Sequence, residues 1–147
     1  MTTPRDILEV ADDLSAGSKE AEWRSAVSRA YYAAFHGARL LLQNCGFAIP
    51  RGEDAHSYLW LRLSNAGHPD VKDAGKQLNQ FRQMRNWADY DLDRQFDQAT
   101  AMGYVVTADG IVELLEQIGN ESSIRTTITE TVKAYERDVL RQMTWHS

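Results

Sequence analysis

Residues 78 to 92 read LNQFRQMRNWADYDL, and this stretch decides the fold because it places charged side chains on the apolar face of a helix. At 100° per residue, apolar side chains recur on one face of such a helix. The members of this apolar stripe are Ala74, Leu78, Phe81, Ala88 and Leu92. Arg85 and Asp89 fall inside the stripe, and Arg82 lies at its edge. A buried, unpaired charge is costly, so we expect these charges to pair, to meet a partner or to line a cavity.

The spacing of Arg85 and Asp89 leaves two interpretations open. The two residues are four positions apart, with the base before the acid, which is the less favourable order against the helix dipole. Stabilisation of the helix alone therefore explains the pair poorly. It is compatible with an internal ion pair that fixes this helix against its neighbours, and it is equally compatible with a site for a phosphate or carboxylate group.

The composition is that of an ordinary globular protein. The chain has 147 residues, of which 43% are hydrophobic and 25% are charged, and we expect one domain with its own core. Cys45 is the only cysteine, so no internal disulfide can form. No signal peptide and no membrane-spanning run is present, which predicts a cytoplasmic protein. The net charge of −5 disfavours sequence-blind adhesion to nucleic acid, although a local arginine cluster can still bind phosphate.

Helical periodicity extends in both directions from the opening stretch. Thr3 before Pro4 is typical of a helix start, Ser18 and Asp70 are candidate N-caps for later helices, and Gly46 is a suitable C-terminal stop. The expected helices cover about residues 4–14, 19–45, 53–66, 70–92, 97–118 and 124–139. The last one carries an apolar stripe that ends at Val139. No hairpin signal or repeat occurs, so we predict an all-α, five- to six-helix up-and-down bundle.

The longest expected helix, residues 19–45, has two distinct faces. Its apolar face consists of Trp23, Val27, Tyr31, Ala34, Ala38, Leu41 and Cys45. Its polar face consists of Ser25, Arg29, Tyr32, His36, Arg39 and Gln43. A polar face is usually only solvated. The combination of arginine, tyrosine and histidine is also compatible with one half of a ligand site.

Motifs for metals and cofactors are absent or incomplete. Glu53 and His56 form one Glu-x-x-His pair, whereas di-iron helix bundles use two such pairs. His56 is therefore interpreted as a helix-face histidine near an N-terminus. No HExxH, paired CxxC, Walker lysine loop or GxGxxG occurs. We expect no metal and no cofactor.

Two segments together resemble a known family. They are SRAYYAAFHGARLLL at Ser28–Leu42 and RQMRNWADYD at Arg82–Asp91, in this order on expected helices. The pair resembles the HEPN superfamily (higher eukaryotes and prokaryotes nucleotide-binding), and it is most similar to small prokaryotic members. The resemblance covers roughly Glu20–Ile118. It implies a helical bundle that dimerises so that the arginine-motif helices of two protomers meet, with Arg82, Arg85 and Asp89 near the two-fold axis.

The resemblance also implies activities. The family includes metal-independent endoribonucleases, toxins paired with nucleotidyltransferase-type antitoxins, and non-catalytic relatives. Its catalytic pattern is an arginine followed, after four to six residues, by a histidine. Arg85 matches the arginine and Asn86 the polar residue that often follows it, but Tyr90 stands where the histidine would be.

This departure predicts weak or lost cleavage. Attack by a ribose 2′-hydroxyl needs a proton acceptor with a pKa near neutral, and the reference pKa of a tyrosine is about 10. Arg85 can still stabilise phosphate charge. His36 could supply the base if the polar face of its helix meets the same site. The candidate catalytic residues are Arg85, Tyr90 and His36.

The expected function is binding of RNA or a nucleotide, as part of a toxin–antitoxin or defence system. Trp87 or Tyr90 would stack on a base. The candidate ligand-binding residues are Tyr32, Arg82, Arg85, Asn86, Asp89 and Tyr90. Two alternatives stay open: an active metal-independent endoribonuclease toxin, and a non-catalytic protein-interaction module.

Overall fold

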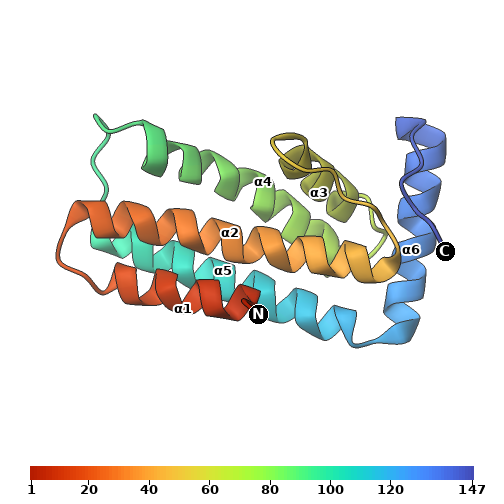
Figure 1. The fold of residues 1–147 in the computed structure, drawn as a ribbon, viewed down its shortest axis with the longest axis horizontal. Helices are drawn as coiled ribbons and strands as arrows, with labels where there is room; N and C mark the ends of the chain where they lie inside the picture. Colours follow the sequence, from red (N-terminus) through yellow and green to blue (C-terminus); the bar gives the residue numbers. More distant parts are fainter.

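The computed structural model describes residues 1–147 and is a bundle of helices (Figure 1). The helices are α1 (Pro4–Ser15), α2 (Glu20–Cys45), α3 (Asp54–Ser64), α4 (Pro69–Tyr90), α5 (Gln98–Gly119) and α6 (Ser122–Tyr135), followed by the π-helical turn η1 (Glu136–Leu140). The predicted all-α bundle of five to six helices is confirmed. None of the helices combines the length and the apolar character needed to cross a membrane.

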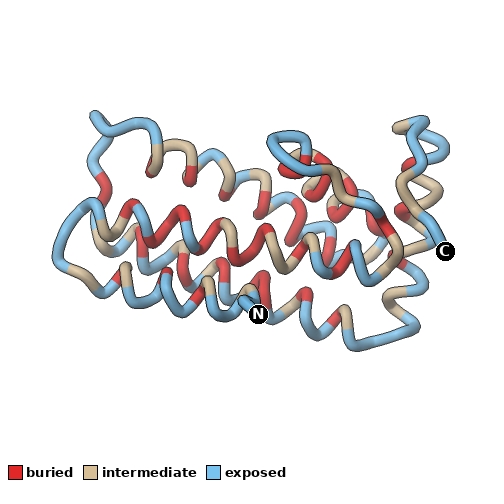
Figure 2. The backbone as a smooth tube through the Cα atoms, viewed as in Figure 1, coloured by how far each residue is buried: buried red, intermediate tan, exposed pale blue.

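The longest helix, α2, is the centre of the bundle. Helices α1, α2, α4 and α5 lie along the long axis and alternate in direction, while the short α3 packs against α4 and α6 crosses one end (Figure 1). Helix α2 contacts α1, α3, α4, α5 and α6. Buried residues line the inward faces of these helices (Figure 2). Tyr31 of α2 and Phe81 of α4 are among the largest fully buried side chains.

The helix ends follow local capping chemistry, with two corrections. The hydroxyl of Thr3 accepts a hydrogen bond from the backbone of Asp6, as its capping role requires. Gly46 ends α2 with a φ of 106°, in the left-handed region that favours glycine. The predicted caps Ser18 and Asp70 are wrong. Helix α2 begins two residues after Ser18. Pro69 occupies the first position of α4, so the cap is the preceding residue, a histidine.

Helix α4 ends earlier than its apolar pattern predicts. Leu92 lies beyond the helix and is 75% exposed, whereas the other members of the predicted stripe are buried. The guanidinium of Arg24, on α2, donates to the backbone oxygens of Trp87 and Ala88 at 3.1 and 3.0 Å. It also donates to the oxygens of two residues in the following loop. A side chain from another helix thus satisfies carbonyls at the C-terminus of α4, where the helix ends.

The C-terminal segment is fastened to α2 and α3. A buried ion pair joins Arg62 of α3 to Glu136 at 2.8 Å, and the indole of Trp145 donates to the oxygen of Cys45 at 2.8 Å. Val139, predicted to continue the apolar stripe of the last helix, is 63% exposed. The π-helical turn η1 explains this difference, because its wider spacing rotates the following residues off the stripe.

Candidate functional site

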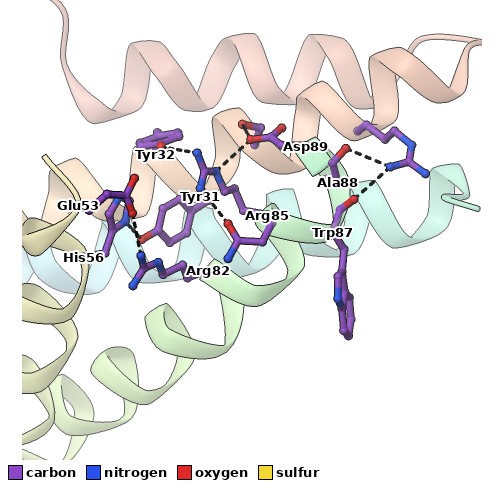
Figure 3. A network of polar contacts seen from close by, with 12 residues as sticks. Tyr31, Tyr32, Glu53, His56, Arg82, Arg85, Trp87, Ala88 and Asp89 are labelled. Carbon is purple, nitrogen blue, oxygen red and sulfur yellow. Dashed lines mark hydrogen bonds and ion pairs between the residues drawn. The ribbon is translucent and has the colours of Figure 1, made fainter. Parts of the chain in front are cut away.

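The central feature of the site is Arg85, whose side chain is held between α4 and α2 (Figure 3). Its Nη2 donates to the hydroxyl of Tyr32 at 2.8 Å, and its Nη1 donates to Oδ1 of Asn86 at 2.9 Å. Asp89 lies one helical turn further along α4, and Ser28 lies opposite on α2. We call these five residues, Ser28, Tyr32, Arg85, Asn86 and Asp89, the Arg85 cluster. The hydrogen bonds fix the guanidinium plane in one orientation.

Asp89 provides the negative charge beside Arg85. Its Oδ2 lies 3.0 Å from Nε of Arg85, but this N–H is not aimed at the carboxylate, so the contact is an ion pair without an aligned hydrogen bond. The same oxygen accepts a hydrogen bond from the Ser28 hydroxyl at 3.1 Å. The side chains of Arg85 and Asp89 are 11% and 27% exposed. The internal ion pair, one of the two interpretations of the sequence, is therefore present.

The ring of Tyr32 is in contact with two guanidinium groups. The Cζ atoms of Arg29 and Arg85 lie 5.1 and 5.2 Å from its centroid, within the range of cation–π attraction. Arg29 is exposed and forms no ion pair. Its place on the polar face of α2 was predicted, but it was not among the candidate site residues. Its position three residues before Tyr32 is the signal that places both side chains on one face.

Tyr90 and Trp87 lie beside the cluster in different environments. Tyr90 is the last residue of α4 and is 72% exposed, and its ring centroid lies 5.4 Å from Cζ of Arg85. Trp87 is half-buried, and its ring is covered by the guanidinium of Arg94 at 3.5 Å. Tyr90 is therefore the more exposed of the two aromatic rings.

Arg82 belongs to a neighbouring polar group (Figure 3). Its Nη2 donates to Glu53 at 3.1 Å, while its Nε is buried without a partner. Beside this pair, the hydroxyl of Tyr31 shares a hydrogen bond of 2.6 Å with Nδ1 of His56. Burial, followed by the positive charge of Arg82, lowers the pKa of His56, and burial raises the pKa of Tyr31. His56 does lie near the N-terminus of α3, but it is only 6% exposed and thus belongs to the interior.

His36 lies one helical turn after Tyr32 on α2 and takes no part in the contacts around Arg85. It lines a hollow of about 310 Å³ together with Thr2, Thr3 and Arg39. No hydrogen bond joins it to the Arg85 cluster. Burial and the nearby charges of Arg39 and Arg29 lower the pKa of His36. One chain therefore brings together Tyr32, Asn86, Asp89 and Tyr90 around Arg85, but not His36.

The comparisons with known proteins identify the family of the chain. A family model described as the HEPN domain matches residues 6–118, which include all of the Arg85 cluster. No curated protein and no solved structure matches the chain. No group of three histidine, cysteine, aspartate or glutamate side chains lies close enough together to hold a metal ion.

Proposed function

Because the chain belongs to the HEPN family, we propose that it binds phosphate groups of RNA or a nucleotide at the Arg85 cluster, with weak or lost ribonuclease activity. The observation that carries this proposal is the buried guanidinium of Arg85, which lies within the apolar stripe of α4 and is oriented by Tyr32 and Asn86. A planar guanidinium fixed in this way can form a bidentate hydrogen-bonded contact with two oxygens of a phosphate group.

The unused donors of Arg85 support the proposal. A guanidinium has five N–H donors, and the contacts with Tyr32 and Asn86 use one each of Nη2 and Nη1. Asp89 neutralises part of the charge, so a bound phosphate needs further positive groups. Arg29 and Arg82 are the neighbouring candidates, and the partner of Arg82, Glu53, has a side chain that is 83% exposed and is easily displaced.

The aromatic residue at the end of α4 explains why we expect little cleavage. Tyr90 stands in the position of the family's histidine, 5.4 Å from the Arg85 guanidinium. The phenol of a tyrosine is a poor proton acceptor at neutral pH, and loss of a general base lowers a rate typically 10²–10⁴-fold. Tyr90 remains suited to stacking on an unpaired base.

The proposed biological setting follows from the family. We propose a homodimer in which Arg82, Arg85 and Asp89 lie near the two-fold axis, within a toxin–antitoxin or defence system that has a nucleotidyltransferase-type partner. Leu92, which is 75% exposed just beyond the end of α4, is apolar surface that such an interface would cover. An adjacent nucleotidyltransferase gene would support this setting.

The binding proposal is tested with a labelled single-stranded RNA and the Arg85→Gln variant. We expect the wild type to bind the RNA, with weaker binding at higher salt, and Arg85→Gln to lose this binding. Lys76→Gln, at an exposed position of α4, is the control for the change in net charge. The double variant Arg85→Gln/Asp89→Asn avoids leaving a partly buried carboxylate without its partner, and so separates lost binding from unfolding. Unchanged RNA binding by the folded double variant would refute the proposal and leave a purely structural role for the pair.

A further inference from the structure

One face of α2, whose residues are exposed or half-buried, is free of carboxylates. It carries Ser25, Arg29, Tyr32, His36, Arg39 and Gln43. The whole chain, in contrast, has 21 acidic and 16 basic residues. We call Arg29, Tyr32, His36 and Arg39 the α2 strip. Two arginines on one helix face of an otherwise acidic protein favour a specific anionic ligand over general adhesion to polyanions.

The charges of the α2 strip are not neutralised from neighbouring elements. Neither Arg29 nor Arg39 forms an ion pair, whereas Arg82 and Arg85 each have a carboxylate partner. Both free arginines act on His36, since burial and the positive charges of Arg39 and Arg29 together lower its pKa. Burial and the two arginines therefore keep His36 largely uncharged near neutral pH, so that its imidazole can act as a neutral hydrogen-bonding group between two positive charges.

The α2 strip connects two places on the surface. At one end, Tyr32 accepts the hydrogen bond from Arg85 and lies against Arg29. At the other end, His36 and Arg39 line a hollow of about 310 Å³ with the hydroxyl-bearing Thr2 and Thr3. Arg29 and Arg39 are ten positions apart on one helix, which is about 15 Å at 1.5 Å per residue. This length is greater than a single phosphate group can contact.

We propose that the α2 strip binds the backbone of a single-stranded RNA and guides it from the Arg85 cluster towards the N-terminal end of α1. This inference rests on the proposed function and specifies its ligand as an oligonucleotide rather than a mononucleotide. Arg29 and Arg39 contact successive phosphates, and His36 hydrogen-bonds between them. Tyr32 and Tyr90 favour a single strand, because stacking on aromatic rings requires unpaired bases.

The test compares two labelled oligouridylates, a dinucleotide and a strand of about ten nucleotides, within the range of single-strand site sizes. We expect the longer strand to bind more tightly to the wild type. In Arg29→Gln and Arg39→Gln, the affinity for the longer strand should fall several-fold, and the slope of log K against log salt should become shallower by about 0.7 for each lost phosphate contact. Binding of the dinucleotide should stay within about twofold of the wild type in Arg39→Gln, since one phosphate contact is sufficient at the Arg85 cluster.

Lys76→Gln serves as the matched control, because it removes one positive charge from another exposed helix position. If Arg39→Gln and Lys76→Gln have equal effects on the longer strand, the α2 strip is not a binding track. If the longer strand binds no better than the dinucleotide, the ligand is not an oligonucleotide, and the proposed function at Arg85 stands without the strip. A different result would contradict the proposed function itself: Arg85→Gln would then bind both the dinucleotide and the longer strand as tightly as the wild type does.

Discussion

The three buried arginines show how single side chains hold this bundle together. Arg24, Arg62 and Arg85 are 8%, 2% and 9% exposed. Arg62 is paired with a buried glutamate, Arg85 with a half-exposed aspartate, and Arg24 mainly with backbone oxygens at the end of α4. The cost of burying each charge is thus offset in a different way. Of the three, Arg85 is the one that lies beside an exposed aromatic ring, that of Tyr90.

Replacement of Arg24 should show that its role is structural. Arg24→Met removes the donors to the carbonyls of Trp87 and Ala88, so we expect the free energy of unfolding to fall by about 2–4 kcal/mol. Arg29→Met, at an exposed position on the same helix, should change it by no more than about 0.5 kcal/mol. Urea denaturation measures both variants. Equal stability of the two variants would show that the α4 cap contributes little.

The buried histidine gives the fold a pH dependence. The pKa of His56 is lowered in the folded state, so the unfolded chain binds more protons below about pH 6.5, the reference value. The free energy of unfolding should therefore decrease as the pH falls from about 6.5 towards the lowered pKa, and should be insensitive to this group above that range. The His56→Gln variant should be less stable than the wild type near neutral pH, but its free energy of unfolding should decrease less than that of the wild type when the pH is lowered. Parallel pH profiles of the two proteins, measured by urea denaturation, would contradict this assignment.

The helices themselves were largely predictable, because each has a 3.6-residue apolar period and clear end signals. The errors arise where an element depends on residues far away in the sequence. Leu92 fits the period of α4, but the helix has already ended at Tyr90. Arg24 of α2 donates to a backbone oxygen in the last turn of this helix. Val139 fits the period of α6, but the π-helical turn shifts its direction. Local periodicity contains no information on such long-range hydrogen bonds.

The C-terminal segment should depend on one ion pair. Glu136→Gln leaves the buried guanidinium of Arg62 without its charged partner, and we expect a loss of about 3–5 kcal/mol in the free energy of unfolding. Glu130→Gln is the control, because the carboxylate of Glu130 is 67% exposed in its pair with Lys133. Thermal unfolding of both variants tests the comparison. A Glu136→Gln protein as stable as the control would mean that the ion pair adds no net stability.

At the level of the whole molecule, the candidate site was predicted only in part. Tyr32, Asn86, Asp89 and Tyr90 do gather around Arg85. The position of His36 was not predictable, because the pattern of α2 gives its polar face but not which neighbouring helix covers each part of it. The same limit applies to Arg29, whose contact with Tyr32 becomes visible only in three dimensions.

We expect the whole molecule to form a dimer in solution. We expect light scattering at micromolar concentration to give the mass of a dimer, and Leu92→Glu to shift it towards the monomer, because Leu92 is an exposed apolar residue just beyond the end of α4. Val106→Glu, at a position of α5 that is 72% exposed, should leave the dimer intact. A strictly monomeric wild type, or equal effects of the two substitutions, would place the interface elsewhere or remove it.

The central claim is that the Arg85 cluster binds RNA phosphate but lacks its general base. The most direct test incubates one labelled RNA with the wild type and with Tyr90→His, in the presence of EDTA, and measures bound and cleaved RNA in the same samples. We predict similar binding by both proteins and substantial cleavage only by Tyr90→His. Robust EDTA-resistant cleavage by the wild type, or the absence of RNA binding by both proteins, would contradict the claim.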